Sequence, residues 1–419
     1  MSSLSSEAAF QQVRSLLGSD RVREPDDRET QAAFAIAEPR NDDEIAALVQ
    51  KCESDRVGLV PIGFARTASQ IRRQPVAFGV SLAHTKRIVA YEPGDMTVIA
   101  EAGLTVGELN DTTAKSGQRL PVDPQMPSST TVGSLIAAAH AGPLRLSEGT
   151  VRDLVIGIRF VGQGGRVVHG GGRVVKNVAG YDLMKVLCGS FGTLGIITEA
   201  TFKVRPIPEG YRVAVAPHER AESAFAHARA LHDSLSLAHL EVLSPGVALA
   251  CGRPGKFVLI AGITGSHSEV RYQADTIKGI TDNVVEFLEP EEGNRTYEWI
   301  RDFDPGAHSL AARVALPPAQ LQSFLTVCDA EFIAHAGSGV AEIFATVTSP
   351  STTDLLAKWR TEARRAGGHI RVLHCDPSER SSIEYFDAPN ATALNLMRRL
   401  KSAFDPSGVF NPRAFVGGI

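Results

Sequence analysis

A glycine-rich stretch, residues 149–205, constrains the fold of this chain more than any other part of its sequence. Two apolar, β-type runs, 155–160 and 166–169, flank a turn at 162–165 that contains three glycines. Two such runs around a glycine-containing turn predict a β-hairpin. The run 196–204 then has the composition of a further strand, so this part of the chain predicts a β-rich domain.

Three glycines recur at every third position just before that last strand, at Gly189, Gly192 and Gly195. Glycine has no Cβ and adopts positive φ at little cost, so it leaves backbone N–H groups uncovered. The glycines therefore either mark turns or let a flat or anionic ligand approach the main chain. Their spacing is not the G-x-G-x-x-G of a Rossmann fold, so a nicotinamide site of the usual kind is not expected.

The length of 419 residues predicts two or three domains. Hydrophobic residues make up 43% of the chain and the net charge is -4, which gives no electrostatic reason to expect a nucleic-acid partner. The N-terminal residues lack the basic and apolar regions of a signal peptide, and no apolar run approaches the roughly 20 residues of a transmembrane helix. Five cysteines without a C-x-x-C pair argue against a zinc or iron–sulfur site.

Helix-capping residues and apolar runs predict several helices and strands in the first third of the chain. Residues 1–30 are polar and predict a lead-in with one short helix at 7–17. Asn41 is a helix N-cap residue followed by apolar residues at helical spacing, and Thr105 with Glu108 forms a capping box that opens another helix. Strands are expected at 57–60, 76–82, 88–91 and 97–102, and a helix of small residues at 130–140.

The pattern changes after Pro206, Pro208 and Gly210, where glycine repeats give way to alternating strand and helix patterns. Strands are expected at 211–216, 238–243, 247–250, 256–263, 284–288, 310–316, 340–347 and 369–374. Helices are expected at 266–280, from 317, and at 352–366. Two β-α-β-type halves of this kind predict ferredoxin-like units packed in one sheet.

The runs KNVAGYD and GTLGIITE, which lie between Lys176 and Val204, resemble the end of the FAD-binding domain of the vanillyl-alcohol oxidase superfamily. The likeness continues upstream through PSSTTVGSLIAAAHAG and downstream to FDPSGVFNP. KNVAGYD is typical of the FAD-binding subunits of bacterial glycolate oxidase, whereas GTLGIITE is shared across the superfamily. The resemblance implies an α+β fold with a lead-in at 1–30, a two-part PCMH-type FAD-binding domain at 31–209 and a ferredoxin-like α+β cap domain at 210–419.

The resemblance also implies non-covalent FAD, because the loop 61–69 contains no histidine, which members with covalently attached flavin carry there. Backbone N–H groups of that loop and of the helix turn at Thr131 are implied to face the pyrophosphate. Arg152 and Asp153 are implied to fix a loop beside the flavin by an ion pair or a turn contact. Lys176 either stabilises the reduced, anionic ring or is a surface lysine on a turn. The residues implied to bind FAD are Pro61, Ile62, Gly63, Phe64, Ala65, Arg66, Thr67, Pro124, Thr131, Val132, Gly133, Ser134, Gly142, Gly149, Arg152, Asp153, Lys176, Asn177, Tyr181, Asp182, Gly192, Gly195, Ile196 and Ile197.

The loop 61–69 departs from the family pattern. Only Gly63 remains of the usual glycine cluster, and Phe64, Ala65 and Arg66 each add a Cβ where the family prefers glycine. Either Arg66 offers a charge to the diphosphate and offsets the lost N–H contacts, or the loop is too crowded to admit the cofactor. We expect FAD to be retained.

The second half has no recognisable substrate or metal site. A 2-hydroxy-acid dehydrogenase needs a base for the hydroxyl proton and a cation for the carboxylate. Catalytic relatives of this branch hold a divalent metal with a motif resembling HAGDGNLH, whereas this chain has HAGSG from His335, with Ser338 in place of the aspartate and no second histidine. No catalytic residue is assigned and no metal is expected. Five further histidines stand isolated in the sequence and are expected to be ordinary surface or core residues: His232, His239, His308, His369 and His374.

The resemblance therefore implies an accessory FAD-binding subunit of a glycolate oxidase complex, which oxidises a small 2-hydroxy acid, glycolate, to glyoxylate. A larger FAD-containing subunit and an iron–sulfur subunit are the implied partners, and a flavin suits a relay between such centres because it passes electrons singly. Two alternatives stay open: a flavin-free structural scaffold of such a complex, and an independent FAD-linked dehydrogenase of another small hydroxy acid. We expect a cytoplasmic protein, which partner subunits could hold at the inner membrane.

Overall fold

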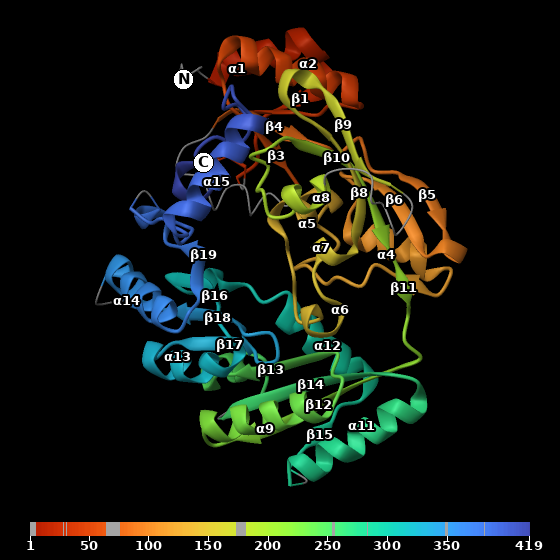
Figure 1. Ribbon diagram of the computed structural model, residues 1–419, viewed down its shortest axis with the longest axis vertical. Helices are drawn as coiled ribbons and strands as arrows, with labels where there is room; N and C mark the ends of the chain where they lie inside the picture. The colour runs from red at the N-terminus through yellow and green to blue at the C-terminus, as the bar shows by residue number, and fades with distance from the viewer. Residues whose placement is uncertain are drawn as a thin grey trace. The chain divides into compact units, whose positions relative to one another are not determined.

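The chain folds into two compact units. The computed structural model describes residues 6–27, 29–30, 32–63, 76–172, 182–253, 256–282, 284–347, 351–380 and 382–419. Unit 1 consists of Met1–His140, Thr150–Ile207 and Ala388–Ile419. Unit 2 consists of Ala141–Gly149 and Pro208–Asp387. Figure 1 shows the helices and strands, with labels where there is room.

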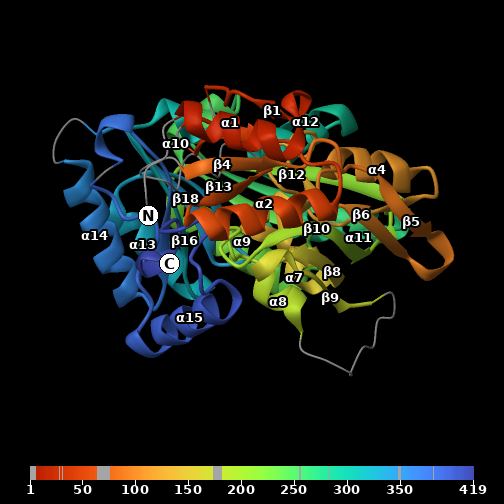
Figure 2. The ribbon, with the colours of Figure 1, turned by 90° about the horizontal axis from the view of Figure 1, so that it is seen from above.

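Unit 1 begins with a four-stranded sheet and two helices. Their bounds are α1 Ser6–Leu17, β1 Val22–Arg23, β2 Ala33–Ala37, α2 Asp42–Asp55, β3 Leu59–Ile62 and β4 Val76–Ser81. The strand order is β1-β2-β4-β3, with β2 and β3 parallel to β4. Every residue of β4 is buried, as is usual for a central strand of a parallel sheet. Helices α1 and α2 contact each other (Figures 1 and 2). Helix α1 also packs on β2.

Unit 1 also contains a five-stranded antiparallel sheet. Its elements are β5 Ile88–Glu92, β6 Thr97–Glu101, β8 Val155–Val161, β9 Val167–Gly171 and β10 Ile196–Lys203. The strand order is β5-β6-β10-β8-β9, which confirms the predicted hairpin because β8 and β9 are antiparallel neighbours. The connecting helices are α4 Val106–Ala114, α5 Val132–Ala138, α7 Val151–Leu154 and α8 Leu183–Leu187. A two-stranded sheet pairs β7 Gln118–Arg119 with β11 Arg205–Pro206.

The predicted helix starts in unit 1 are confirmed. The Asn41 side chain accepts a hydrogen bond from the N–H of Glu44 (2.9 Å), so α2 has the expected N-cap. Thr105 accepts from the N–H of Glu108 (3.1 Å), and the Glu108 carboxylate accepts from the N–H of Thr105 (3.0 Å). This reciprocal pair is a capping box at the start of α4.

Unit 2 is built on one antiparallel sheet of eight strands. Its elements are β12 Gly210–His218, α9 Ala221–Ser234, β13 His239–Leu243, α10 Pro245–Ala250, β14 Phe257–Gly265, α11 His267–Ile280, β15 Glu286–Phe287, α12 Pro290–Arg301, β16 Leu310–Ala315, α13 Leu321–Cys328, β17 Glu331–His335, β18 Val340–Ala345, α14 Thr352–Arg365 and β19 His369–Cys375. The strand order is β15-β12-β14-β13-β17-β18-β16-β19. Helix α9 contacts α11 and α13, and α13 contacts α14, so these four helices form one layer. Val247 of α10 and Ile300 of α12 are buried in a separate apolar cluster with Ile260 and Ile333 of the sheet.

One predicted strand of unit 2 is wrong. Residues 247–250 were expected to be extended, but they belong to helix α10. Pro245 occupies the first turn, where its fixed φ favours a helix and its missing N–H costs nothing. The Glu331 carboxylate then accepts from the N–H groups of Gly246 (3.0 Å) and Val247 (3.3 Å), which stabilises this helix start from a neighbouring strand. In unit 2 the sequence patterns also missed α9, α12 and β17, and in the C-terminal segment of unit 1 they missed α15, Ala391–Phe404.

The two compact units differ from the predicted division at residues 209 and 210 in two places. The C-terminal segment Ala388–Ile419 belongs to unit 1, because the Leu59 N–H donates to Val409 O (2.9 Å) and the Asn411 N–H donates to Leu59 O (2.7 Å). The segment Ala141–Gly149 belongs to unit 2. Among the helices in the described ranges, none combines the length and apolar character needed to cross a membrane.

Candidate functional site

Three of the segments predicted to bind FAD meet in unit 1. A Cβ on Gly63, just after β3, would lie 2.6 Å from Thr131 Oγ1 and 2.8 Å from the Cβ of Ser134, so only glycine permits this approach to the start of α5. A Cβ on Gly192 would lie 3.0 Å from the ring of Pro61. The end of β3, the start of α5 and the turn at Gly192 therefore pack against one another.

The turn at Gly192 has the backbone that an anion site requires. Phe191, Gly192 and Gly195 have φ of 52°, 70° and 150°, and the Phe191 N–H donates to a carbonyl oxygen of α5 (2.8 Å). Within the described part of the chain, no hydrogen bond uses the Gly192 N–H. N–H groups in such a turn can bind diphosphate oxygens. The Gly192 N–H therefore suits a diphosphate oxygen, which fits a dinucleotide bound at this turn.

The first turn of α5 uses its own N–H groups inside unit 1. Those of Val132 and Gly133 donate to carbonyl oxygens between β6 and α4 (2.8 and 2.9 Å), and that of Ser134 donates to Thr131 Oγ1 (3.2 Å). Contact between this turn and the pyrophosphate stays a prediction, and it cannot come from these three N–H groups. The hydroxyl groups of Thr131 and Ser134 are the donors that this turn can offer.

Arg152 and Asp153 lie at the exposed surface in α7. The Asp153 carboxylate accepts from the Thr150 N–H (2.9 Å) and the Thr150 hydroxyl (2.8 Å). The bond from the Thr150 N–H is the main cause of the lowered pKa of Asp153. The Arg152 carbonyl oxygen accepts from the Lys185 ammonium group of α8. Asp153 thus makes a turn contact with Thr150, and its place beside the flavin stays a prediction.

The other predicted FAD-binding residues of unit 1 occupy different environments. Pro124 is buried in the segment before α5, and Asp182 is exposed at the start of α8. Ile196 and Ile197 begin β10 and are buried in the unit 1 core. Their side chains contribute to packing, and their contact with FAD stays a prediction.

Two predicted residues, Gly142 and Gly149, fall in the unit 2 segment Ala141–Gly149. Gly149 has φ of 80°, which explains the glycine at that position. The remaining predicted residues lie outside the described ranges: Phe64, Ala65, Arg66, Thr67, Lys176, Asn177 and Tyr181.

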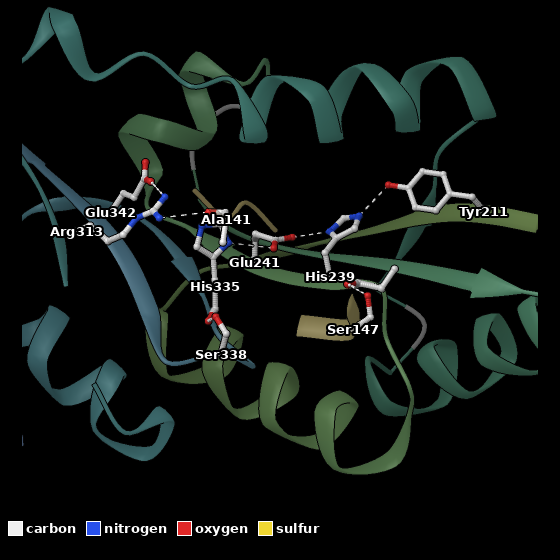
Figure 3. A network of polar contacts seen from close by, with 10 residues as sticks. Ala141, Ser147, Tyr211, His239, Glu241, Arg313, His335, Ser338 and Glu342 are labelled. Atoms are coloured by element: carbon white, nitrogen blue, oxygen red, sulfur yellow. Dashed lines mark hydrogen bonds and ion pairs between the residues drawn. The ribbon is translucent and has the colours of Figure 1, made fainter. Parts of the chain in front are cut away.

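A row of polar side chains crosses one face of the unit 2 sheet (Figure 3). Glu241 of β13 is fully buried and interacts with Nδ1 of His239 (2.6 Å) and Nδ1 of His335 (3.3 Å). The Nε2 atom of His239 lies 2.8 Å from the hydroxyl oxygen of Tyr211 on β12. We call Tyr211, His239, Glu241 and His335 the Glu241 cluster.

The strand geometry explains why the Glu241 cluster forms. His239 and Glu241 are two residues apart on one strand, so both side chains point to the same face. Glu241 is paired directly with His335 in the antiparallel register of β13 and β17. Gly262 of β14 is paired with His239, and a Cβ there would lie 2.1 Å from the imidazole ring. The ring occupies the space that the missing side chain leaves.

Glu241 is ionised in this environment. Burial would raise its pKa, but the charge and hydrogen bond of His239, with a smaller effect of His335, lower it to about 2. The carboxylate accepts from Nδ1–H of both imidazoles, which fixes the orientation of each ring. Nε2 of His239 lies within hydrogen-bonding distance of the Tyr211 hydroxyl.

Arginines occupy the other end of the same face. Arg313 of β16 pairs with Glu342 of β18 (2.5 Å) and donates to the carbonyl oxygen of Ala141 (3.3 Å). Arg371 of β19 lies directly opposite Arg313 in the sheet. Burial and then the like charge of Arg313 lower the pKa of Arg371 to about 10. Two cations beside one carboxylate favour an anionic ligand at this end of the row.

His239 is a buried histidine whose two ring nitrogens have polar partners, as expected of a core histidine. The sequence did not show that it and His335 share one partner. Both contact Glu241, whose role the sequence patterns missed. The signal for it was the sequence His-x-Glu at residue 239, which places both groups on one face of a strand. Within the residues that the structure describes, no group of three or more His, Cys, Asp or Glu could hold a metal ion.

Fold and glycine segments together define an α+β protein with a PCMH-type FAD-binding domain. Residues 33–171 match the model of the FAD binding domain, and residues 208–414 match that of the FAD linked oxidases, C-terminal domain. The chain belongs to this superfamily of FAD-linked oxidases and is an FAD-dependent oxidoreductase. The predicted FAD cofactor is thereby confirmed, and non-covalent attachment is consistent with the family.

Several proteins resemble all or part of the chain. A mitochondrial D-lactate dehydrogenase [cytochrome] of Arabidopsis thaliana is 28% identical over 416 residues, which cover 89% of this chain and 72% of that protein. Glycolate oxidase subunit GlcE of Escherichia coli (strain K12) is 39% identical over 122 residues, which cover 29% of this chain and 35% of that protein. A crystal structure of p-cresol methylhydroxylase with bound substrate shares the fold, with a TM-score of 0.72, 16% identity and coverage of 98% of this chain and 96% of that one.

Proposed function

We propose that this chain is the FAD-binding accessory subunit of a glycolate oxidase complex, in which glycolate is oxidised to glyoxylate. The observation that carries the proposal is the stretch of 39% identity to glycolate oxidase subunit GlcE. The sequence KNVAGYD, typical of that branch, supports it. A larger flavin-containing subunit and an iron–sulfur subunit are the proposed partners, at the cytoplasmic side of the inner membrane.

The main-chain groups of unit 1 would hold the cofactor. Gly63, Thr131, Ser134 and the Gly192 turn pack together, and the Gly192 N–H is suited to a diphosphate oxygen. FAD held there would supply the ability to accept two electrons together and to release them singly. The protein residues orient the dinucleotide and keep it without a covalent bond.

The activity of the chain, measured alone and with its partners, tests the accessory role. The isolated chain is expected to be yellow and to lack turnover of glycolate with a dye acceptor, whereas the chain coexpressed with the two partner subunits reduces the dye. Activity of the isolated chain would contradict the accessory role. A colourless chain that does not bind added FAD would instead support the flavin-free scaffold.

The second candidate is an independent FAD-linked dehydrogenase of a small 2-hydroxy acid. The unit 2 row favours it, because His335 Nε2 can accept a hydroxyl proton and Arg313 with Arg371 can attract a carboxylate. Glycolate, D-lactate and D-2-hydroxyglutarate, each assayed with a dye and the isolated chain, separate the two candidates. If this candidate is right, His335→Gln lowers kcat on the active substrate by about a hundredfold.

We also infer that unit 2 contains two ferredoxin-like halves. In chain order the first half is β12, α9, β13, β14, α11 and β15, with α10 inserted after β13. The second is β16, α13, β17, β18, α14 and β19. Numbered along the chain, the strands of each half lie in the spatial order 4-1-3-2, which supports the same β-α-β-β-α-β unit in both.

A further inference from the structure

The C-terminal segment 405–411 extends the sheet of unit 1 next to the FAD-binding turn. The Leu59 N–H donates to Val409 O (2.9 Å), and the Asn411 N–H donates to Leu59 O (2.7 Å). Leu59 begins β3, the strand that leads directly to Gly63. The segment is therefore fixed to one of the elements that converge on the cofactor-binding backbone.

Asn411 of this segment and Lys401 of α15 contact the Gly192 turn on both sides. Asn411 Nδ2 donates to the carbonyl oxygen of Phe191 (2.6 Å), and Lys401 Nζ of α15 donates to that of Thr193 (2.8 Å). These are the carbonyl groups immediately before and after Gly192. The ring of Phe191 also stacks on that of Phe415, with 5.4 Å between centroids.

The backbone of the turn is strained, so contacts from other parts of the chain must stabilise it. Phe191 has φ of 52°, a left-handed conformation that costs free energy for a residue with a Cβ. Such a conformation persists only where surrounding contacts over-determine it. The bonds from Asn411 and Lys401 supply those contacts while they leave the Gly192 N–H open.

Asp405 fixes the position of Lys401 and of the residues that follow it. Its side chain is fully buried and accepts from Lys401 Nζ (2.5 Å) and from the N–H groups of Val409 (3.0 Å) and Phe410 (2.9 Å). Lys401 also donates to Phe410 O (2.8 Å), so its three hydrogen-bond donors are all used. Both charged groups are thus held in one geometry.

We propose that Lys401, Asp405 and Asn411 form a C-terminal clamp that positions the Gly192 turn and thereby sets the affinity of this chain for FAD. The three are positioning residues that act through the carbonyl groups of Phe191 and Thr193. The clamp goes beyond the proposed function, because it concerns retention of the cofactor whatever the substrate is.

Two substitutions test the clamp in the full-length protein. Lys401→Met keeps the length of the side chain but removes its hydrogen-bond donors. Asn411→Gly removes the side-chain amide, and glycine tolerates the positive φ at that position (39°). Each is expected to raise the Kd for FAD about tenfold, the effect of freeing roughly one backbone residue that binding must then order again. Titration of apoprotein with FAD, followed by flavin fluorescence, measures it.

A matched control separates the clamp from general loss of charge. Lys51→Met removes another lysine that pairs with an aspartate four residues on, Asp55 (2.8 Å), in α2 of the same unit. It is expected to leave the Kd for FAD unchanged. The clamp is refuted if both Lys401→Met and Asn411→Gly bind FAD within twofold of the parent protein.

Hydrogen exchange in the unmodified chain gives a second test that needs no variant to fold. Coupling between two sites is reciprocal, so FAD binding must stabilise the clamp as much as the clamp favours FAD. The N–H groups of Val409 and Phe410 are therefore expected to exchange more slowly in saturating FAD, by a factor at least tenfold larger than for those of α2. Equal exchange of Val409 and Phe410 with and without bound FAD would overturn the proposal.

Discussion

Glu241 shows how one residue can depend on its neighbours for its charge. Its folded pKa of about 2 lies below the value of about 4.3 for an unperturbed glutamate. Its contribution to stability is therefore fully present above about pH 4.3 and is lost as the pH falls toward 2. The histidines that lower the pKa are also the groups that its removal would leave without an acceptor.

Glu241→Gln is expected to lower the free energy of unfolding by about 2 kcal/mol at pH 6, the usual value of a hydrogen bond to a charged group. The difference from the parent protein should shrink between about pH 4.3 and pH 2, because the parent itself loses the charge there. Urea unfolding at several pH values measures it. Glu219→Gln, at a side chain that is 76% exposed, serves as the control with little effect at any pH. A difference for Glu241→Gln that does not change with pH would contradict the assignment.

Gly63 is the residue on which the packing of the FAD-binding segments depends most directly. In Gly63→Ala the new Cβ would lie 2.6 Å from Thr131 Oγ1, so β3 and α5 must move apart. Overpacking of this kind costs about 1–3 kcal/mol, and we expect the Kd for FAD to rise about tenfold. Gly94→Ala is the matched control, since a Cβ there has no neighbour within 4 Å. Equal FAD affinity in the two variants would show that this close approach has no part in binding.

At the scale of elements, the polar row on the unit 2 sheet depends on Gly262 of β14, because the missing side chain leaves space for the His239 ring. Gly262→Ala would place a Cβ 2.1 Å from the His239 ring and displace it from Glu241 and Tyr211. We expect the free energy of unfolding to fall by at least about 2 kcal/mol. Gly279→Ala in α11 has no neighbour within 4 Å and should stabilise the protein by about 0.5–1 kcal/mol through helix propensity. Chemical denaturation compares the two, and similar effects would refute the account.

Local signals predicted the elements that local interactions stabilise. Asn41 with Glu44 and Thr105 with Glu108 are contacts within one helical turn, so the sequence shows both partners. Residues 247–250 misled the prediction because part of what stabilises α10 is the carboxylate of Glu331, far along the chain. Strand β17 was missed for a similar reason, since its pairing with β13 is long-range.

The lack of long-range information in sequence patterns also explains why one candidate site was predicted and the other was not. Gly63, Thr131 and Gly192 were predicted to bind FAD from a family resemblance, which carries the long-range information that spacing lacks. For the Glu241 cluster the resemblance pointed to an absent metal motif, and the register of β13 with β17 was needed to join His335 to Glu241. The clamp at Lys401 was equally hidden, because Thr193 lies far away in the sequence.

For the molecule as a whole, the division into two units predicts how the cofactor affects stability. The FAD-binding segments lie in unit 1, whereas the Glu241 cluster lies in unit 2. A ligand that binds only the folded form of a unit stabilises that unit, by about 2.7 kcal/mol at roughly 100 times its Kd. We therefore expect calorimetry to show two unfolding transitions, of which saturating FAD raises only the one that belongs to unit 1. Gly262→Ala should lower the other transition, and this assigns each transition to its unit. If FAD raised both transitions equally, the two units would unfold as one and the cofactor would stabilise the entire chain.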